Sequence, residues 1–174
     1  MFNNKNMITA TAFMGFLLAA PAGIAQADET PINGTVQSRC IIQTDVSGTY
    51  GNPNAYTLTT SASDGGENAV IRIDVSLADA YYAEITAPQS FTSSPILPDQ
   101  VTWTGDTIVK TVSDATAMGA YETSKIELGM MDRYDLTATG STWFETSSVA
   151  AMGGTKAFPG GNYTALVLAE CIAQ

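Results

Sequence analysis

The chain has 174 residues and is acidic, with 17 Asp and Glu against 7 Lys and Arg and a net charge of −10 at pH 7. Such a surface repels phosphate backbones, which argues against nucleic-acid binding. The sequence has no histidine, so the usual general base for a serine or cysteine nucleophile and the commonest metal ligand are both missing. We therefore predict a non-enzymatic protein with no catalytic residue, no cofactor and no metal site. A carboxylate pair for glycoside hydrolysis is the alternative, although no pair among the acids stands out.

Residues 1–27 have the pattern of a secretory signal peptide. Lys5 precedes an apolar run over residues 7–20, and Ala25 and Ala27 supply the small residues of a cleavage site. No later segment is apolar over enough residues to span a bilayer. We predict a single domain over residues 28–174, exported to the periplasm, the cell surface or the extracellular space, with no membrane span in the mature chain.

In the exported part, apolar and polar residues alternate with the two-residue period of β-strands. The clearest case is residues 69–77, where Ile, Val and Leu at alternate positions face away from Arg72 and Asp74. The last predicted strand carries apolar side chains at both its odd and its even positions, which point to opposite faces. We therefore expect both of its faces to be covered. In chain order, the predicted strands are residues 35–42, 55–61, 69–77, 82–87, 101–104, 107–112, 125–130, 133–139, 142–146 and 163–172.

Turn and loop signals separate these strands. The pair Gly105-Asp106 predicts a two-residue hairpin turn, and the three prolines of residues 88–98 predict an irregular connection. Residues 64–68 have too few regularly spaced oxygens for a calcium loop, so we interpret them as a turn. Residues 113–120 are compatible with one helical turn, and residues 148–155 with a loop.

Many short strands in an exported chain of this length predict an all-β fold, namely a single antiparallel β-sandwich with an immunoglobulin-like or Greek-key arrangement. The two cysteines, Cys40 and Cys171, lie near the opposite ends of this domain. Disulfides persist in exported proteins, and two thiols without histidine make no complete zinc site. We therefore predict one disulfide between Cys40 and Cys171, which places their strands side by side or facing each other across the sandwich.

The aromatic residues allow two interpretations. Trp103 and Trp143 each alternate with polar neighbours inside a predicted strand, as core residues do. Alternatively, they stack on sugar rings from an exposed face, as in a secreted carbohydrate-binding module. Tyr81 and Tyr82 are adjacent, so one of them has to point away from the core.

A segment near the end of the chain resembles a known group of proteins. Over residues 158–168, a Pro-Gly-Gly turn that begins at Pro159 leads into an alternating strand that opens with Tyr163 and Thr164. Together with the leader and the early Cys40, this segment resembles the closing strand of secreted bacterial sandwich proteins of the fimbrial-subunit and spore-coat-U type.

The resemblance implies an immunoglobulin-like domain that polymerises by accepting a strand from a neighbour. On this basis we expect a structural or adhesive surface protein, pilin-like in its assembly, whose partners are other copies of itself or other surface subunits. A complete sandwich that assembles through its faces, or a monomer, remains the alternative to strand exchange.

Overall fold

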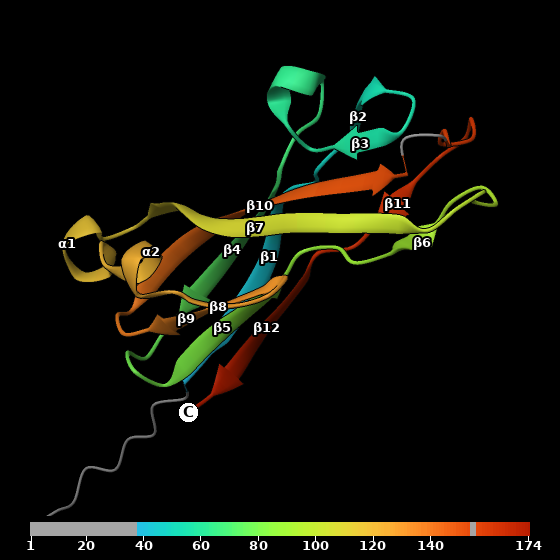
Figure 1. Ribbon diagram of the computed structural model, residues 1–174. Coiled ribbons are helices and arrows are strands. Elements are labelled where there is room, and N and C mark those ends of the chain that lie inside the picture. The colour runs from blue at the N-terminus through green and yellow to red at the C-terminus, as the bar shows by residue number, and fades with distance from the viewer. Residues whose placement is uncertain (1–37, 154–155) are drawn as a thin grey trace, which may run out of the picture. The chain divides into compact units, whose positions relative to one another are not determined.

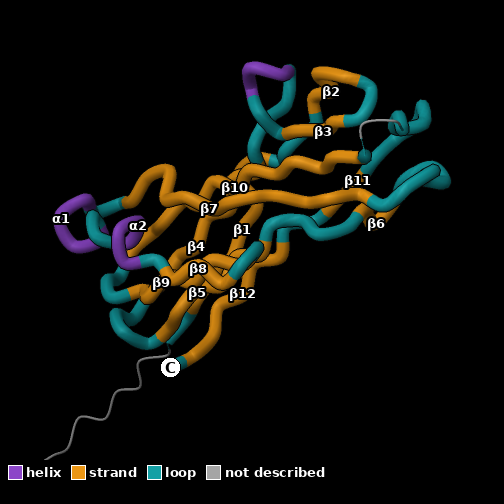
Figure 2. Tube along the Cα trace, viewed as in Figure 1, coloured by secondary structure: helices purple, strands orange, loops and turns teal. Residues whose placement is uncertain are grey.

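The computed structural model describes residues 38–153 and 156–174, which lie in one compact unit (Figure 1). The predicted leader over residues 1–27 and the start of the predicted strand 35–42 lie outside the described residues. Strands dominate, and the helical elements are short (Figure 2). The strands are β1 (Cys40–Val46), β2 (Gly51–Asn54), β3 (Thr57–Thr59), β4 (Ala69–Val75), β5 (Tyr81–Thr86), β6 (Phe91–Ser93), β7 (Val101–Val112), β8 (Ile126–Leu128), β9 (Met131–Leu136), β10 (Gly140–Met152), β11 (Thr164–Ala165) and β12 (Leu168–Ala173).

The helical elements are the 3-10 turn η1 (Ala62–Asp64) and the helices α1 (Ala115–Met118) and α2 (Tyr121–Ser124). The helical turn predicted within residues 113–120 is confirmed by α1. It begins after Asp114, whose carboxylate accepts hydrogen bonds from the main-chain N–H groups of Thr116 and Ala117. Among the described residues, no helix has the length and apolar character to cross a membrane.

The long strand β10 organises the first sheet. Along one side it pairs with β7, and along the other it pairs first with β4 and then with β3. Strand β1 lies outside β4, and β2 lies outside β3. All of these pairings are antiparallel.

The second sheet has the antiparallel order β12-β5-β9-β8. The short strands β11 and β6 form a separate two-stranded sheet. The inner face of the second sheet meets the inner face of the first sheet in one hydrophobic core. Ile73 and Phe144 of the first sheet are 1% and 0% exposed, and Ile85 and Tyr134 of the second are 0% and 1% exposed. The prediction of an all-β antiparallel sandwich is therefore confirmed.

The predicted disulfide between Cys40 and Cys171 is also confirmed. Cys40 begins β1, an edge of the first sheet, and Cys171 lies in β12, an edge of the second. Their Cα atoms are 6.3 Å apart. The bond thus closes the sandwich across one of its open sides rather than joining two strands of one ladder.

The predicted hairpin turn at Gly105-Asp106 is wrong. Both residues lie within the twelve-residue strand β7, where Gly105 pairs with Ser148 and Asp106 with Ser147 of β10. A Cβ on Gly105 would lie 2.6 Å from the main-chain oxygen of Ser147 and 2.7 Å from the Cβ of Ala87. Glycine is needed here because β10 and Ala87 approach closely, not because the chain reverses its direction.

Other segments also differ from the prediction. Strand β10 continues to Met152 through most of the predicted loop 148–155, with strictly alternating burial. The predicted last strand is split into β11 and β12. Leu166 and Leu168 are 65% and 55% exposed, so the expectation that both faces of this segment are covered is wrong. Within the predicted irregular connection 88–98, the short strand β6 pairs with β11.

Candidate functional site

A second aromatic cluster lies apart from the main core. Its centre is Phe91 of β6, whose ring centroid is 4.7 Å from that of Trp103, 5.0 Å from Tyr163, 6.1 Å from Phe158 and 6.3 Å from Tyr50. The cluster joins Tyr50 to the 91–103 region and to residues 158–163. All five are half-buried, whereas the core rings of Tyr134 and Phe144 are almost fully buried.

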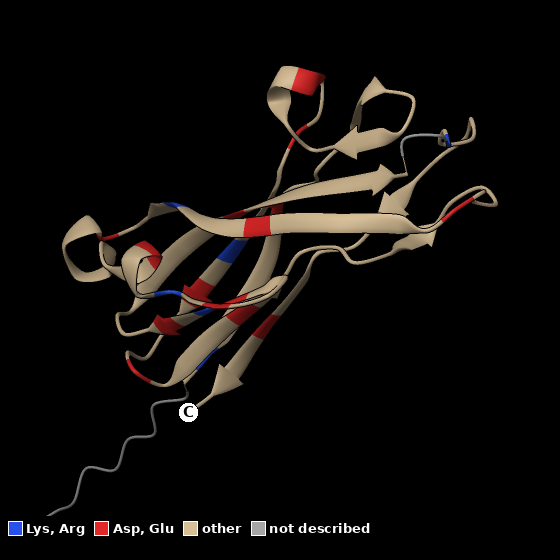
Figure 3. Cartoon of the chain, viewed as in Figure 1, with Lys and Arg blue, Asp and Glu red and all other residues tan. Residues whose placement is uncertain are grey.

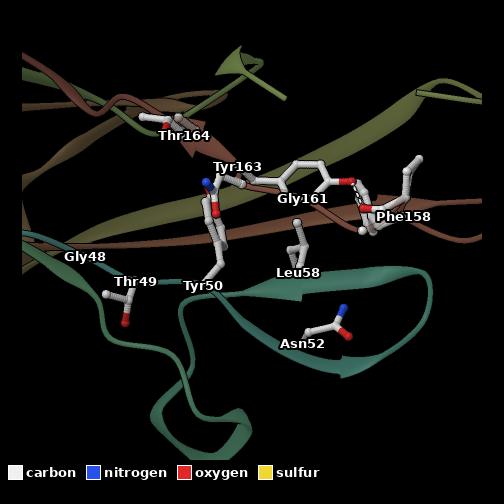
Figure 4. A pocket seen from close by; sticks show the side chains of 13 residues that line it. Gly48, Thr49, Tyr50, Asn52, Leu58, Phe158, Gly161, Tyr163 and Thr164 are labelled. Atoms are coloured by element: carbon white, nitrogen blue, oxygen red, sulfur yellow. Dashed lines mark hydrogen bonds between the residues drawn. The ribbon is translucent and has the colours of Figure 1, made fainter. Parts of the chain in front are cut away.

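A pocket of about 630 Å³ opens beside this cluster (Figure 4). One wall carries Tyr50 and Leu58, and the other is the chain from Phe158 to Ala165. Figure 4 shows Leu58 of β3 facing the ring of Tyr163 across the opening. Pockets of this size commonly hold small ligands.

Hydrogen bonds fix the rings that line the pocket. The hydroxyl of Tyr163 donates to the main-chain oxygen of Pro159 at 2.5 Å. The hydroxyl of Tyr50 lies 2.9 Å from the Oγ of Ser148 on β10. Burial raises the pKa of both tyrosines above the ordinary value, so both hydroxyls stay neutral at physiological pH.

The glycine-rich segment that leads into Tyr163 has a structural reason for its composition. Gly161 has φ +153°, a conformation that side chains disfavour. A Cβ there would also lie 2.5 Å from the Cγ of Pro95. The turn at Pro159 therefore folds tightly against the 94–100 loop and holds the ring of Tyr163 at the pocket wall.

A smaller pocket of about 330 Å³ adjoins the first, and both are lined by Gly48, Tyr50, Thr164 and Ala165. It extends toward Thr44 and Val46 of β1 and Leu166 before β12. No charged side chain lines either pocket within the described residues. In Figure 3, the nearby strands β2, β3, β6 and β11 likewise carry no acidic or basic residue.

The structure does not bring the two predicted glycan-stacking residues together. Trp103 pairs with Ala150, which is fully buried and belongs to the inner face of the first sheet. Trp143 lies on the outer face of the same sheet, where the guanidinium of Arg72 is 5.9 Å from its ring centroid. Because they lie on opposite faces, Trp103 and Trp143 cannot form one stacking platform.

The adjacent tyrosines also divide between the two faces of their sheet. Tyr81 packs against the core, and its hydroxyl is hydrogen-bonded to Ser38. Tyr82 lies on the outer face, with the guanidinium of Arg133 4.4 Å from its ring centroid. The expectation that one of the pair lies outside the core is confirmed.

The turn interpretation of residues 64–68 agrees with the structure. Asp64 ends η1, Gly65 follows with φ +80°, and Glu67 forms a bridge with Thr49. Asn68 donates to Glu145 of β10, so its side-chain amide is engaged in holding the turn against the sheet.

An acidic cluster elsewhere has the spacing of metal ligands. Carboxylate oxygens of Asp106, Glu127 and Asp132 lie within 4.8 Å of one another. The ammonium of Lys125 contacts Asp106 at 2.9 Å and Glu127 at 3.3 Å. Burial lowers the pKa of Lys125, but the hydrogen bond to Asp106 and the surrounding carboxylates outweigh this effect and raise it. A protonated lysine thus already supplies positive charge to the cluster.

Sequence reasoning missed Tyr50, Phe158 and Tyr163 as pocket residues. The segment that contains Phe158 and Tyr163 is conspicuous in the sequence, but its pattern predicts a turn and a strand rather than a binding surface. Nothing in the sequence joins Tyr50, more than a hundred residues earlier, to that segment. The chain matches no protein-family model, and comparisons with curated proteins and with solved structures also give no match.

Proposed function

We propose that this chain is an exported, non-enzymatic structural or adhesive surface subunit that associates with further copies through the edge strand β1. The observation that carries the proposal is the state of this edge. No strand among the described residues pairs with its outer side, and Ile41 and Ile42 are 45% and 39% exposed. Unpaired, apolar strand edges invite partner strands.

The other edges of the first sheet contrast with β1. The main-chain N–H groups of Thr107 and Val109 in β7 donate to carboxylates of Asp132 and Glu122. Strand β2 is short and contains Pro53, which has no N–H to offer. These edges are blocked, whereas no described strand pairs with the outer side of β1, and this contrast favours β1 as the site of association.

Strand β12 extends the same surface. It is an edge of the second sheet, and the disulfide between Cys40 and Cys171 holds it beside β1. Leu168 of β12 is largely exposed, and so is Leu166, which lines a pocket together with Thr44 and Val46 of β1. An added strand would therefore meet apolar side chains from both sheets, the arrangement that β-augmentation uses.

Export and surface location rest on the predicted leader and on the disulfide, because disulfides persist mainly in oxidising compartments. The non-enzymatic role rests on the missing histidine. The resemblance to fimbrial-subunit and spore-coat-U proteins adds the expectation of an ordered polymer, formed by strand or face pairing.

Sedimentation velocity of the mature chain, residues 28–174, tests the association. We expect the mass to rise with protein concentration and to return to the monomer in Ile41→Lys. Ile108→Lys is the matched control, because Ile108 is similarly exposed (43% against 45%). Each isoleucine also pairs with an acidic residue, Asp74 for Ile41 and Glu145 for Ile108. A monomer at all concentrations, or equal effects of both substitutions, contradicts the proposal.

The cellular role has its own test. Surface material sheared from the native cell should contain this chain in filaments visible by negative-stain microscopy. Recovery of the chain only as a monomer in periplasmic extracts contradicts a surface role.

A further inference from the structure

The aromatic pocket has a ligand chemistry of its own, independent of assembly through β1. We propose that it binds an uncharged saccharide, with the half-buried rings of Tyr163, Tyr50 and Phe158 against the apolar C–H face of the sugar. This site differs from the predicted one, because neither Trp103 nor Trp143 lines the pocket.

The lining disfavours charged ligands. The protein carries a net charge of −10, yet no Asp, Glu, Lys or Arg lines the pocket or its extension within the described residues. A charged ligand would lose hydration on entry without gaining an ion pair. A neutral ligand avoids this loss of ionic hydration.

The partly exposed rings favour a ligand with an apolar surface that can pack against them. Tyr50, Phe158 and Tyr163 are half-buried although the fold places each of them in a ring cluster. Phe91 and Trp103 are half-buried as well but do not line the pocket, whereas Tyr50, Phe158 and Tyr163 all line it. Partly exposed aromatic rings around a concavity are typical of binding sites.

The rim supplies polar groups for hydroxyls. Asn162 is exposed at the pocket, and Thr49, Thr164 and the glycines of the turn line it too. Asn52 already donates its amide to the main-chain oxygens of Asn54 and Thr57. Both of these bonds use its side-chain nitrogen. A pyranose ring, with an apolar face and a hydroxyl edge, matches rings bordered by amides and hydroxyls.

An extended peptide fits this place less well. A peptide that adds to a sheet needs a row of unpaired main-chain groups. At the pocket, β11 has only two residues and already pairs with β6. Strand β2 is interrupted by Pro53. Side-chain recognition of a compact neutral ligand is therefore favoured over strand addition.

The test uses the mature chain with Trp143→Phe, so that the remaining tryptophan, Trp103, packs against Phe91 at the centre of the cluster. Neutral oligosaccharides from glucans, xylans, mannans and galactans are titrated while tryptophan emission is recorded, and calorimetry confirms each hit. We expect saturable binding of at least one of them. Tyr163→Ala should weaken it by about tenfold or more, as the loss of one stacking ring does.

Three further variants separate binding at this site from folding and from assembly. Tyr56→Ala is the control, since Tyr56 is an exposed tyrosine that does not line the pocket, and it should change affinity less than about twofold. Asn162→Ala removes an exposed rim group and should weaken binding at an unchanged melting temperature. Ile41→Lys should bind as the parent does, which distinguishes failure of this site from failure of the assembly.

Four results would overturn the proposal. They are no binding of any neutral oligosaccharide at millimolar concentration, binding of anionic polysaccharides such as polygalacturonate alone, binding of unstructured peptides in place of sugars, and equal losses in Tyr163→Ala and Tyr56→Ala.

Discussion

The main-chain N–H of Thr107, in the middle of edge strand β7, donates to the carboxylate of Asp132 at 2.9 Å. The main-chain oxygen of Thr107 accepts from the hydroxyl of Tyr134 at 2.5 Å and from the ammonium of Lys125 at 3.1 Å. Asp132 and Tyr134 belong to β9 in the opposite sheet. Side chains therefore take the place of a strand along this edge, and they join two sheets that share no ladder among the described strands.

Asp132 should make stability depend on pH. It is 3% exposed, and burial raises its pKa, although the N–H of Thr107 and the charge of Lys125 oppose the shift. The folded state therefore holds this proton to a higher pH than the unfolded state, whose value is about 3.9. The contribution to stability is full below that value and is lost as the pH rises through the folded-state pKa.

Asp132→Asn keeps an acceptor for Thr107 and removes the titration. We expect its melting temperature to exceed that of the parent at pH 7, with the difference closing below about pH 4. Thermal unfolding at matched ionic strength between pH 3.5 and 8 measures this. A variant that is less stable than the parent at pH 7 would show that the charge of Asp132 is needed for the edge contact.

Gly105 should be intolerant of any side chain. A Cβ at this position would meet the oxygen of Ser147 at 2.6 Å and the Cβ of Ala87 at 2.7 Å. Such overpacking costs about 1 to 3 kcal/mol, so Gly105→Ala should lower the free energy of unfolding by this amount. In the control, Gly160→Ala, a Cβ would meet nothing within 4 Å, and the change should stay within about 0.5 kcal/mol. Equal stability of the two variants would contradict the close approach.

Gly105 also shows where sequence reasoning fails. Strand β4 was predictable because its alternation of Arg72 and Asp74 with apolar residues is local, and burial of Ile71, Ile73 and Val75 confirms it. In a local pattern, Gly-Asp between two strand-like segments looks like a turn. The actual reason for the glycine is the approach of β10 and Ala87, which no local pattern contains.

The candidate site illustrates the same limit. The cysteine pair could be predicted because only two thiols exist, so their pairing needs no geometry. The pocket depends on the packing of Tyr50, Phe158 and Tyr163 around Phe91, which depends on sheet order. The opposite faces of Trp103 and Trp143 follow from the register of β7 on β10, and register is set by tertiary packing.

Glu145 should control the turn that contains η1. Asn68 donates to one oxygen of Glu145 at 2.9 Å, and the ammonium of Lys110 lies 2.9 Å from the other. These two contacts lower the pKa of Glu145 below its ordinary value. The stabilisation is therefore present above the unfolded value of about 4.3 and is lost as the pH falls through the lower folded-state value.

Glu145→Gln removes the ion pair, which costs less than about 1 kcal/mol globally because the pair is partly exposed. Amide exchange over residues 61–68 should nevertheless become faster, since Asn68 loses a charged acceptor. Glu170→Gln, on β12 of the other sheet, is the control and should leave these amides unchanged. Unaltered exchange in Glu145→Gln would show that the turn is held by its main-chain bridge between Thr49 and Glu67 alone.

The bond between Cys40 and Cys171 should supply a large share of the stability. Their separation of 131 residues corresponds to roughly 4 to 5 kcal/mol in the chain-entropy treatment, against a typical total of about 5 to 15 kcal/mol for a domain. We expect the double variant Cys40→Ser, Cys171→Ser to unfold at much lower urea concentration, and the parent with reductant to behave in the same way. A loss below about 1 kcal/mol would mean that contacts between β1 and β12 close this side of the sandwich without the covalent link.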